Sequence, residues 1–194
     1  MLSATMPRLL NINQGMIVPM NKSLPLLCLS AAMLASNAHA QSALTTYGDI
    51  AQIGIPLTAG AISLYKGDKE GFVQLAEGAL YTVIATQGLK YAVNAERPNG
   101  GEHSFPSGHT SAATQGAAYL QFRYGAAYGV PAYAAAALVG YSRVEGEYHH
   151  WRDVIAGMAL ATGIQYAVTE AGYSITVHPY FADKETGIFA QMNF

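Results

Sequence analysis

Residues 154–168 read VIAGMALATGIQYAV, and this stretch carries the clearest structural pattern in the chain. The residues that recur at steps of three or four are Val154, Met158, Ala161 and Gln165. That spacing places side chains along one face of an α-helix, whereas a half-buried strand would need strict alternation of apolar and polar residues. The stretch therefore predicts a helix that turns one face toward a core.

Four more apolar stretches precede it, at residues 50–65, 72–94, 109–124 and 130–141, and each ends at Gly, Pro or a polar cluster. Of the 194 residues, 51% are hydrophobic and only 11% are charged. An average soluble domain has about 25% charged residues, so this composition excludes a disordered chain and a coiled coil. We therefore expect an all-α bundle of about five helices.

In the C-terminal tail, residues 173–194, apolar residues recur at every second position instead of every third or fourth. Alternating apolar residues flank a polar turn at 182–187, namely Tyr173, Ile175 and Val177 before it and Ile188, Ala190, Met192 and Phe194 after it. This pattern predicts a short β-hairpin that covers one side of the bundle. An envelope-targeting edge is the alternative, but two strands alone cannot satisfy their backbone groups in lipid.

The N-terminus has the order of a secretory signal: the basic residues Arg8 and Lys22, the apolar residues 24–35, and the small-residue site Ala38-His39-Ala40. We expect residues 1–40 to be a signal peptide that is cleaved after Ala40, with Met20 as a possible true start. The only cysteine, Cys28, lies within this segment. The remaining chain would then consist of a helical catalytic domain, residues 41–172, and the hairpin, residues 173–194.

Charge and hydropathy limit which partners the protein can bind and where in the cell it can act. Without Arg8 and Lys22, eight basic and twelve acidic residues remain, and no basic run is present, so nucleic acid is excluded as a partner. The stretches at 72–94 and 109–124 contain several charged or amide side chains that would be costly in lipid. We expect a periplasmic or cell-envelope protein with at most peripheral membrane contact; an integral membrane protein is the alternative.

Three clusters of reactive residues follow one another: Lys90-x6-Arg97-Pro98, Pro106-Ser107-Gly108-His109, and Ser142-Arg143-x5-His149-x3-Asp153. In the first, Lys90 and Arg97 are seven residues apart and fall on one side of a helix that Pro98 terminates. Two cations at one helix end can bind an anion. A solvated basic face would give the same pattern, and only the other two clusters argue against it.

The second cluster begins a helix. Ser107 can cap it, which leaves free backbone N–H groups and the positive end of the helix dipole directed at an anion, and Gly108 allows a close approach. His109 follows directly and can protonate an alkoxide leaving group near neutral pH.

In the third cluster, His149 and Asp153 are four residues apart on one helix face. The carboxylate can hold the imidazole while the other ring nitrogen attacks phosphorus. His150 is three residues from Asp153 and could pair with it instead. Arg143 has the planar fork that suits two phosphoryl oxygens.

These motifs resemble those of the type 2 phosphatidic acid phosphatase superfamily, which includes acid phosphatases, lipid phosphate phosphatases and vanadium haloperoxidases. The resemblance covers residues 90–153 and implies a helical bundle that hydrolyses phosphate esters through a phosphohistidine, with no metal or other cofactor. It selects His149 over His150, because the family spacing is five residues after Ser142-Arg143. The gap Asn99–Phe105 between the first two motifs is shorter than usual in the family and leaves little room for a substrate-selecting loop.

The predicted enzyme is thus a phosphatase acting on phosphate monoesters or on lipid phosphates and diphosphates. His149 attacks, His109 protonates the leaving oxygen and Asp153 supports His149; the predicted phosphate-binding residues are Lys90, Arg97, Ser107, Gly108 and Arg143. Three alternatives stay open. They are a metal-dependent hydrolase with ligands among His103, His109, His149 and His150, a vanadium haloperoxidase, and a catalytically silent phosphate-binding envelope protein.

Overall fold

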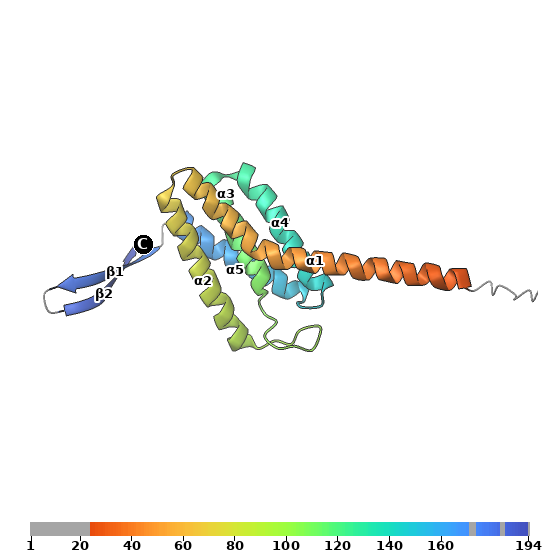
Figure 1. The fold of residues 1–194 in the computed structure, drawn as a ribbon. Coiled ribbons are helices and arrows are strands. Elements are labelled where there is room, and N and C mark those ends of the chain that lie inside the picture. Colours follow the sequence, from red (N-terminus) through yellow and green to blue (C-terminus); the bar gives the residue numbers. More distant parts are fainter. Residues whose placement is uncertain (1–23, 171–173, 183–184, 194) are drawn as a thin grey trace, which may run out of the picture. The chain divides into compact units, whose positions relative to one another are not determined.

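The computed structural model describes residues 24–170, 174–182 and 185–193, with side chains described for residues 43–170. The elements are α1 (Leu24–Tyr65), α2 (Lys69–Val93), α3 (Gly108–Tyr124), α4 (Ala126–Glu145), α5 (Trp151–Thr169), β1 (Ser174–Ala182) and β2 (Glu185–Asn193) (Figure 1). The chain divides into two units, residues 1–38 and 39–194. The account below concerns the second unit, and of the first only the start of α1 is described.

The prediction of five helices in an all-α bundle is confirmed. Predicted and observed ends agree within three residues for α2, α3 and α5. Two helices are longer than predicted, because α1 begins at Leu24 rather than at residue 50 and α4 runs from Ala126 to Glu145. The predicted stretch 130–141 already included Pro131, and α4 extends four residues further at each end.

The two strands pair antiparallel, with Ser174 opposite Asn193 and Ala182 opposite Glu185. Tyr173 and Phe194 of the predicted hairpin lie outside the described residues, as do Arg8 and Lys22 of the predicted signal peptide. No helix in the described part of the chain is both long and apolar enough to cross a bilayer.

The core forms around α3, which packs against α2, α4 and α5. Its buried face consists mostly of small residues, and Ala113, Ala117 and Ala118 are fully buried. Small side chains let helix axes approach closely, so the bundle is tight at its centre. Gly116 of α3 faces Pro56 of α1, where an added Cβ would lie 2.7 Å from the Pro56 Cα.

Helix ends are closed by side chains that the sequence supplies locally. Asp68 precedes α2 and accepts a hydrogen bond from the Gly71 N–H at 2.9 Å. Ser107 caps α3 and Asp153 closes the start of α5, where its Oδ2 accepts from the His150 N–H at 2.9 Å. Asn94 ends α2 in the left-handed conformation, with φ of 42°. These ends place all three motifs at helix termini.

Candidate active site

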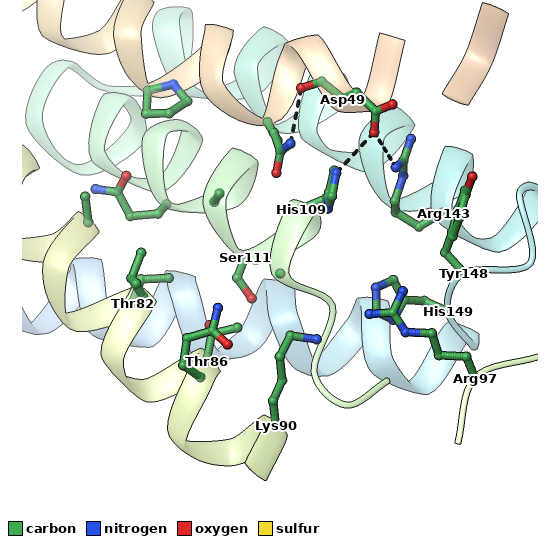
Figure 2. Close-up of a pocket in the computed structure, with 18 residues that line it drawn as sticks. Asp49, Thr82, Thr86, Lys90, Arg97, His109, Ser111, Arg143, Tyr148 and His149 are labelled. Carbon is green, nitrogen blue, oxygen red and sulfur yellow. Dashed lines mark hydrogen bonds and ion pairs between the residues drawn. The ribbon is translucent and has the colours of Figure 1, made fainter. Parts of the chain in front are cut away.

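A pocket of about 630 Å³ lies among α1, α2, α3 and α4 and the two segments that precede α3 and α5. Six of the eight residues that the sequence predicts for the site line it: Lys90, Arg97, Gly108, His109, Arg143 and His149. Figure 2 shows the labelled members of this set around one space, although 59 residues separate Lys90 from His149 in the sequence. The other two, Ser107 and Asp153, are fully buried and do not line the pocket.

The segment between α2 and α3 folds back on the end of α2 and fixes the two cations of the first motif. Lys90 Nζ donates to the carbonyl of His103 at 2.8 Å, and Arg97 Nε donates to the carbonyl of Glu102 at 3.0 Å. The short gap between the first two motifs therefore supplies backbone acceptors for these side chains. Both cations thus line the pocket together with the first residue of α3, and the two hydrogen bonds above join them to carbonyls rather than to carboxylates.

The start of α3 presents its backbone to the pocket. The hydroxyl of Ser107 is 3.5 Å from the Thr110 N–H that it caps and 2.9 Å from the Thr110 hydroxyl. Ser107 is fully buried, and its hydroxyl contacts the start of α3. Gly108 lines the pocket, and only the Lys90 Cε would approach a Cβ placed there, at 3.6 Å. An anion can therefore reach the free N–H groups of the first turn.

The segment before α3 is also tied to α5. The Ser107 N–H donates to the backbone carbonyl of Asp153 at 2.9 Å. This hydrogen bond joins the second motif to the third and ties the start of α3 to the start of α5.

His149 is held through a serine that the sequence did not single out. The Ser104 hydroxyl donates to Asp153 Oδ2 at 2.5 Å and lies 3.3 Å from His149 Nδ1. The direct separation of His149 Nδ1 from Asp153 Oδ2 is 3.7 Å, which is an ion-pair distance and too long for a hydrogen bond. All three groups are buried, so the carboxylate acts on the imidazole partly through Ser104.

The pKa of His149 is lowered to about 4, first by burial and then by the positive charges of Lys90 and Arg97. The imidazole is therefore neutral near neutral pH and keeps a lone pair for attack on an electrophile. His150 does not line the pocket and begins α5 instead.

Across the pocket from Lys90, Asp49 of α1 joins His109 and Arg143 (Figure 2). Asp49 Oδ1 lies 3.1 Å from His109 Nε2 and accepts from Arg143 Nη1 at 2.7 Å (Figure 2). Arg143 also donates from Nη2 to the Thr45 carbonyl at 2.6 Å and from Nε to the Ser142 hydroxyl at 3.0 Å. Each terminal nitrogen carries two N–H groups, so one on each is left to meet an anion.

The pKa of His109 is lowered below its ordinary value of 6.5, first by burial and then by the positive charge of Arg143. Asp49 opposes this shift by its charge and its hydrogen bond. The carboxylate therefore favours the protonated imidazole, which is the form that can donate a proton.

Gly48 allows α1 to approach Arg143. A Cβ at Gly48 would overlap the Ser142 hydroxyl and the Arg143 guanidinium. Only a residue without a side chain leaves room for Arg143 to pass α1 and reach Asp49 and the Thr45 carbonyl.

The sequence analysis missed Asp49 and Ser104. Asp49 is 60 residues from His109 and 94 from Arg143, and no motif surrounds it. Ser104 falls in the irregular segment before Pro106, where no periodicity assigns a direction to a side chain. The one signal in the sequence that could have indicated Asp49 is its place directly before the apolar stretch 50–65.

The described residues contain no group of three or more His, Cys, Asp or Glu side chains placed to hold a metal ion. His103, one of the alternative ligands, donates from Nδ1 to the Lys90 carbonyl at 3.2 Å and packs its ring against Tyr91.

Comparison with known proteins adds two findings. The model of the PAP2 superfamily matches residues 71–174. The chain is also 31% identical over 134 residues to a lipid A 4'-phosphatase of Helicobacter pylori, and the match covers 63% of this chain and 67% of that protein. No solved structure matches the chain significantly.

Proposed function

Since this chain belongs to the PAP2 superfamily and is a phosphatase, we propose that it hydrolyses a phosphorylated lipid through a phosphohistidine on His149, without a metal ion. The observation that carries the proposal is the meeting of Lys90, Arg97, His109, Arg143 and His149 at one pocket. The relative's name indicates lipid A as one substrate of this class.

In the first step, the free ring nitrogen of neutral His149 attacks phosphorus and the bond from phosphorus to the leaving oxygen breaks. Protonated His109 gives its proton to that oxygen, so the product leaves as an alcohol. Asp153 and Ser104 stabilise the imidazole as it gains positive charge. In the second step, water attacks the phosphohistidine, His109 accepts a proton from the water, and inorganic phosphate leaves.

The charge that develops on the phosphoryl oxygens is met by Lys90, Arg97, Arg143 and the N–H groups at the start of α3. Phosphoryl transfer depends mainly on positioning and on such electrostatic stabilisation. Asp49 is a positioning residue here, because it holds Arg143 and supports the charged form of His109.

The test is phosphate release from a lipid phosphate and from a small aryl phosphate, in chelator, by the wild type and two variants. We expect His149→Ala to abolish turnover and His150→Ala to retain most of it, since His150 does not line the pocket. Wild type quenched at alkaline pH should carry phosphate on histidine that is stable in base and released in acid. Activity that survives His149→Ala, or that disappears in chelator, would contradict the mechanism.

The proposal includes export. A signal peptide of residues 1–40 is supported by the order of basic, apolar and small residues that ends at Ala38-His39-Ala40. The enzyme would then act in the periplasm or cell envelope as a catalytic domain, 41–172, with a separate C-terminal hairpin, 173–194. Limited proteolysis between the two parts should leave phosphatase activity in the larger fragment.

Peripheral contact with a membrane belongs to the same proposal. Apolar side chains of α1 and α2 stay exposed, among them Ile53, Leu57, Leu80 and Ile84. A surface of this kind can lie against lipid. Flotation of the protein with phospholipid vesicles tests this part.

A further inference from the structure

His103 is a histidine next to the pocket that the proposed mechanism does not use. It belongs to the segment between α2 and α3, is half-buried and does not line the pocket itself. Its φ of 56° lies in the left-handed region. This conformation costs free energy for any residue other than glycine, although histidine and asparagine adopt it more readily than most. Contacts of the side chain must therefore keep His103 in place.

Two hydrogen bonds join His103 to Lys90, one in each direction. Lys90 Nζ donates to the His103 carbonyl at 2.8 Å, and His103 Nδ1 donates to the Lys90 carbonyl at 3.2 Å. Lys90 lies in the last turn of α2, where backbone carbonyls lack partners further along the helix. The Asn94 N–H bonds to the same carbonyl at 3.0 Å. A carbonyl oxygen has two lone pairs, so the imidazole takes the second acceptor site at this helix end.

These contacts order the Lys90 side chain before an anion arrives. A lysine side chain is flexible, and fixing it costs conformational entropy. Figure 2 shows Lys90 reaching from α2 toward the segment before α3, where the His103 carbonyl accepts one of its three N–H groups. Burial and the charge of Arg97 lower the pKa of Lys90, so its ammonium form benefits from this acceptor. The carbonyl stays in position because the imidazole bonds to α2 and packs against Tyr91.

We propose that His103 is a positioning residue for phosphate binding. Its imidazole holds the backbone of Lys90, and its own carbonyl then directs the Lys90 ammonium into the pocket. The inference rests on the proposed function for the identity of the anion, which is the phosphoryl group of the substrate. It gives the short segment Asn99–Phe105 a part in binding that group, although His103 does not touch it.

The experiment measures the Kd for inorganic phosphate by titration calorimetry and kcat/KM for p-nitrophenyl phosphate. His103→Gly removes the imidazole and accepts the left-handed backbone. His103→Asn also accepts that backbone and places an amide N–H at the position of Nδ1. We expect His103→Gly to raise Kd and lower kcat/KM about tenfold each, which is the usual effect of losing one hydrogen bond. His103→Asn should stay within about twofold of the wild type, because it keeps the donor.

Asn94→Gly is the matched control. Asn94 lies in the same connection, has a positive φ of 42° and an exposed side chain, and bonds to Lys90 through a backbone N–H that glycine keeps. Kd and kcat/KM should stay at the wild-type level in this variant. A tenfold loss here as well would mean that an added glycine loosens the connection, and the assignment to the imidazole would be wrong.

Lys90→Met shows through which residue His103 acts. If the imidazole acts by positioning the ammonium, K90M/H103G should have the same Kd and kcat/KM as K90M, because the group to be positioned is gone. A merely structural role would instead add its own loss to that of K90M. A further tenfold loss in the double variant would therefore overturn the inference.

The outcomes separate this inference from the proposed function. If the wild type is active and His103→Gly equals it, the assignment is wrong and the phosphatase mechanism stands. If the wild type binds phosphate but hydrolyses no ester, the proposed function fails, and the Kd values still decide on His103. If His103→Gly does not fold, a tenfold loss in His103→Asn still contradicts the inference. Weaker phosphate binding in His103→Gly that His103→Asn restores and K90M abolishes would support it.

Discussion

At the scale of single residues, the two pocket histidines set the pH range of activity. His149 must be neutral to attack, and its pKa is about 4. His109 must be protonated to donate, and its pKa lies below 6.5. We therefore expect kcat/KM to rise with pH through the pKa of His149 and to fall again through the pKa of His109. The maximum should lie on the acidic side of pH 6.5, measured with an aryl phosphate from about pH 3 to pH 8.

The basic limb of that profile tests the role of Asp49. The carboxylate raises the pKa of His109, so Asp49→Asn should lower it and move the limb to lower pH. The acidic limb, which belongs to His149, should stay in place. Glu70→Gln, at an exposed position outside the pocket, is the control and should leave both limbs unchanged. A basic limb that moves to higher pH would exclude the proposed contact.

Some residues of the site could be predicted from local sequence motifs, and others could not. Lys90, Arg97, His109 and His149 were found because each stands in a local pattern that links residue type to a helix end. Asp49 and Ser104 act only through contacts with distant parts of the chain, and such contacts leave no local pattern. The indirect link from Asp153 to His149 could not be predicted for the same reason. A spacing of four residues predicts that the two side chains share one helix face, but it does not predict that Ser104 lies between them.

At the scale of elements, the apolar stretches predicted which helices exist. They did not predict where every helix begins and ends, because those positions depend on contacts of individual side chains. Thr45–Asp49 is polar and includes Gly48, so hydropathy placed the start of the first helix after it. The structure continues α1 through this segment, because the glycine fits against Ser142 and Arg143 and the polar groups bind α4. A tertiary contact thus outweighed the low helix propensity of glycine.

The crossing of α1 and α3 depends on Gly116. A Cβ there would lie 2.7 Å from the Cα and 2.8 Å from the N of Pro56, and a backbone cannot move aside cheaply. We expect Gly116→Ala to lower the free energy of unfolding by about 1–3 kcal/mol, as overpacking of a core does. Activity should fall as well, because the displaced helix carries Asp49.

Gly88→Ala on α2 is the matched change, since nothing lies within 4 Å of a Cβ at Gly88. Alanine favours a helix over glycine by up to about 1 kcal/mol, so this variant should be at least as stable as the wild type. Thermal unfolding of the two variants side by side measures the difference. A Gly116→Ala variant as stable as Gly88→Ala would contradict the close crossing.

The turn between α1 and α2 is joined to the end of α3 by Asp68. Its carboxylate accepts from Arg123 Nη2 at 2.6 Å, from Arg123 Nε at 2.7 Å and from the Tyr124 hydroxyl at 2.9 Å, besides capping α2. We expect Asp68→Ala to reduce the free energy of unfolding by about 3 kcal/mol, because it leaves Arg123 with only its longer contacts to Glu70 and Gln74 and leaves α2 without its cap. Asp68→Asn, which keeps a capping oxygen, should cost less.

The pH dependence of this ion pair has a definite sign. The hydrogen bonds from Arg123 lower the pKa of Asp68 well below its ordinary value of 3.8. The stabilisation is therefore fully present above about pH 3.8 and is lost as the pH falls and the carboxylate takes up a proton. Urea unfolding at several acidic pH values should show a shallower loss of stability in Asp68→Asn than in the wild type, while kcat/KM near neutral pH stays unchanged.

At the scale of the whole molecule, the proposed removal of residues 1–40 can be tested on the fold and on the site. Cleavage after Ala40 would leave α1 from Gln41, and the described contacts that α1 makes with α4 start beyond that point. The Thr45 carbonyl and Asp49 bind Arg143, and the Tyr47 hydroxyl donates to the Ala135 carbonyl at 3.0 Å. Residues 41–194 thus contain every described partner of the candidate site.

Two truncated chains test this. The chain that begins at Gln41 should fold and keep the full kcat/KM, because no described contact of the site is removed. The chain that begins at Ile50 loses Thr45, Tyr47 and Asp49, which leaves the buried guanidinium of Arg143 without two of its three partners. We expect its kcat/KM to fall at least about a hundredfold, since leaving a buried charge unpaired costs on the order of 3 kcal/mol or more. N-terminal sequencing of the protein isolated from cells supplies the third measurement, and a start at Gln41 would agree with an active shorter chain. An inactive chain from Gln41, beside an active full-length protein, would instead mean that residues before the predicted cleavage site belong to the enzyme.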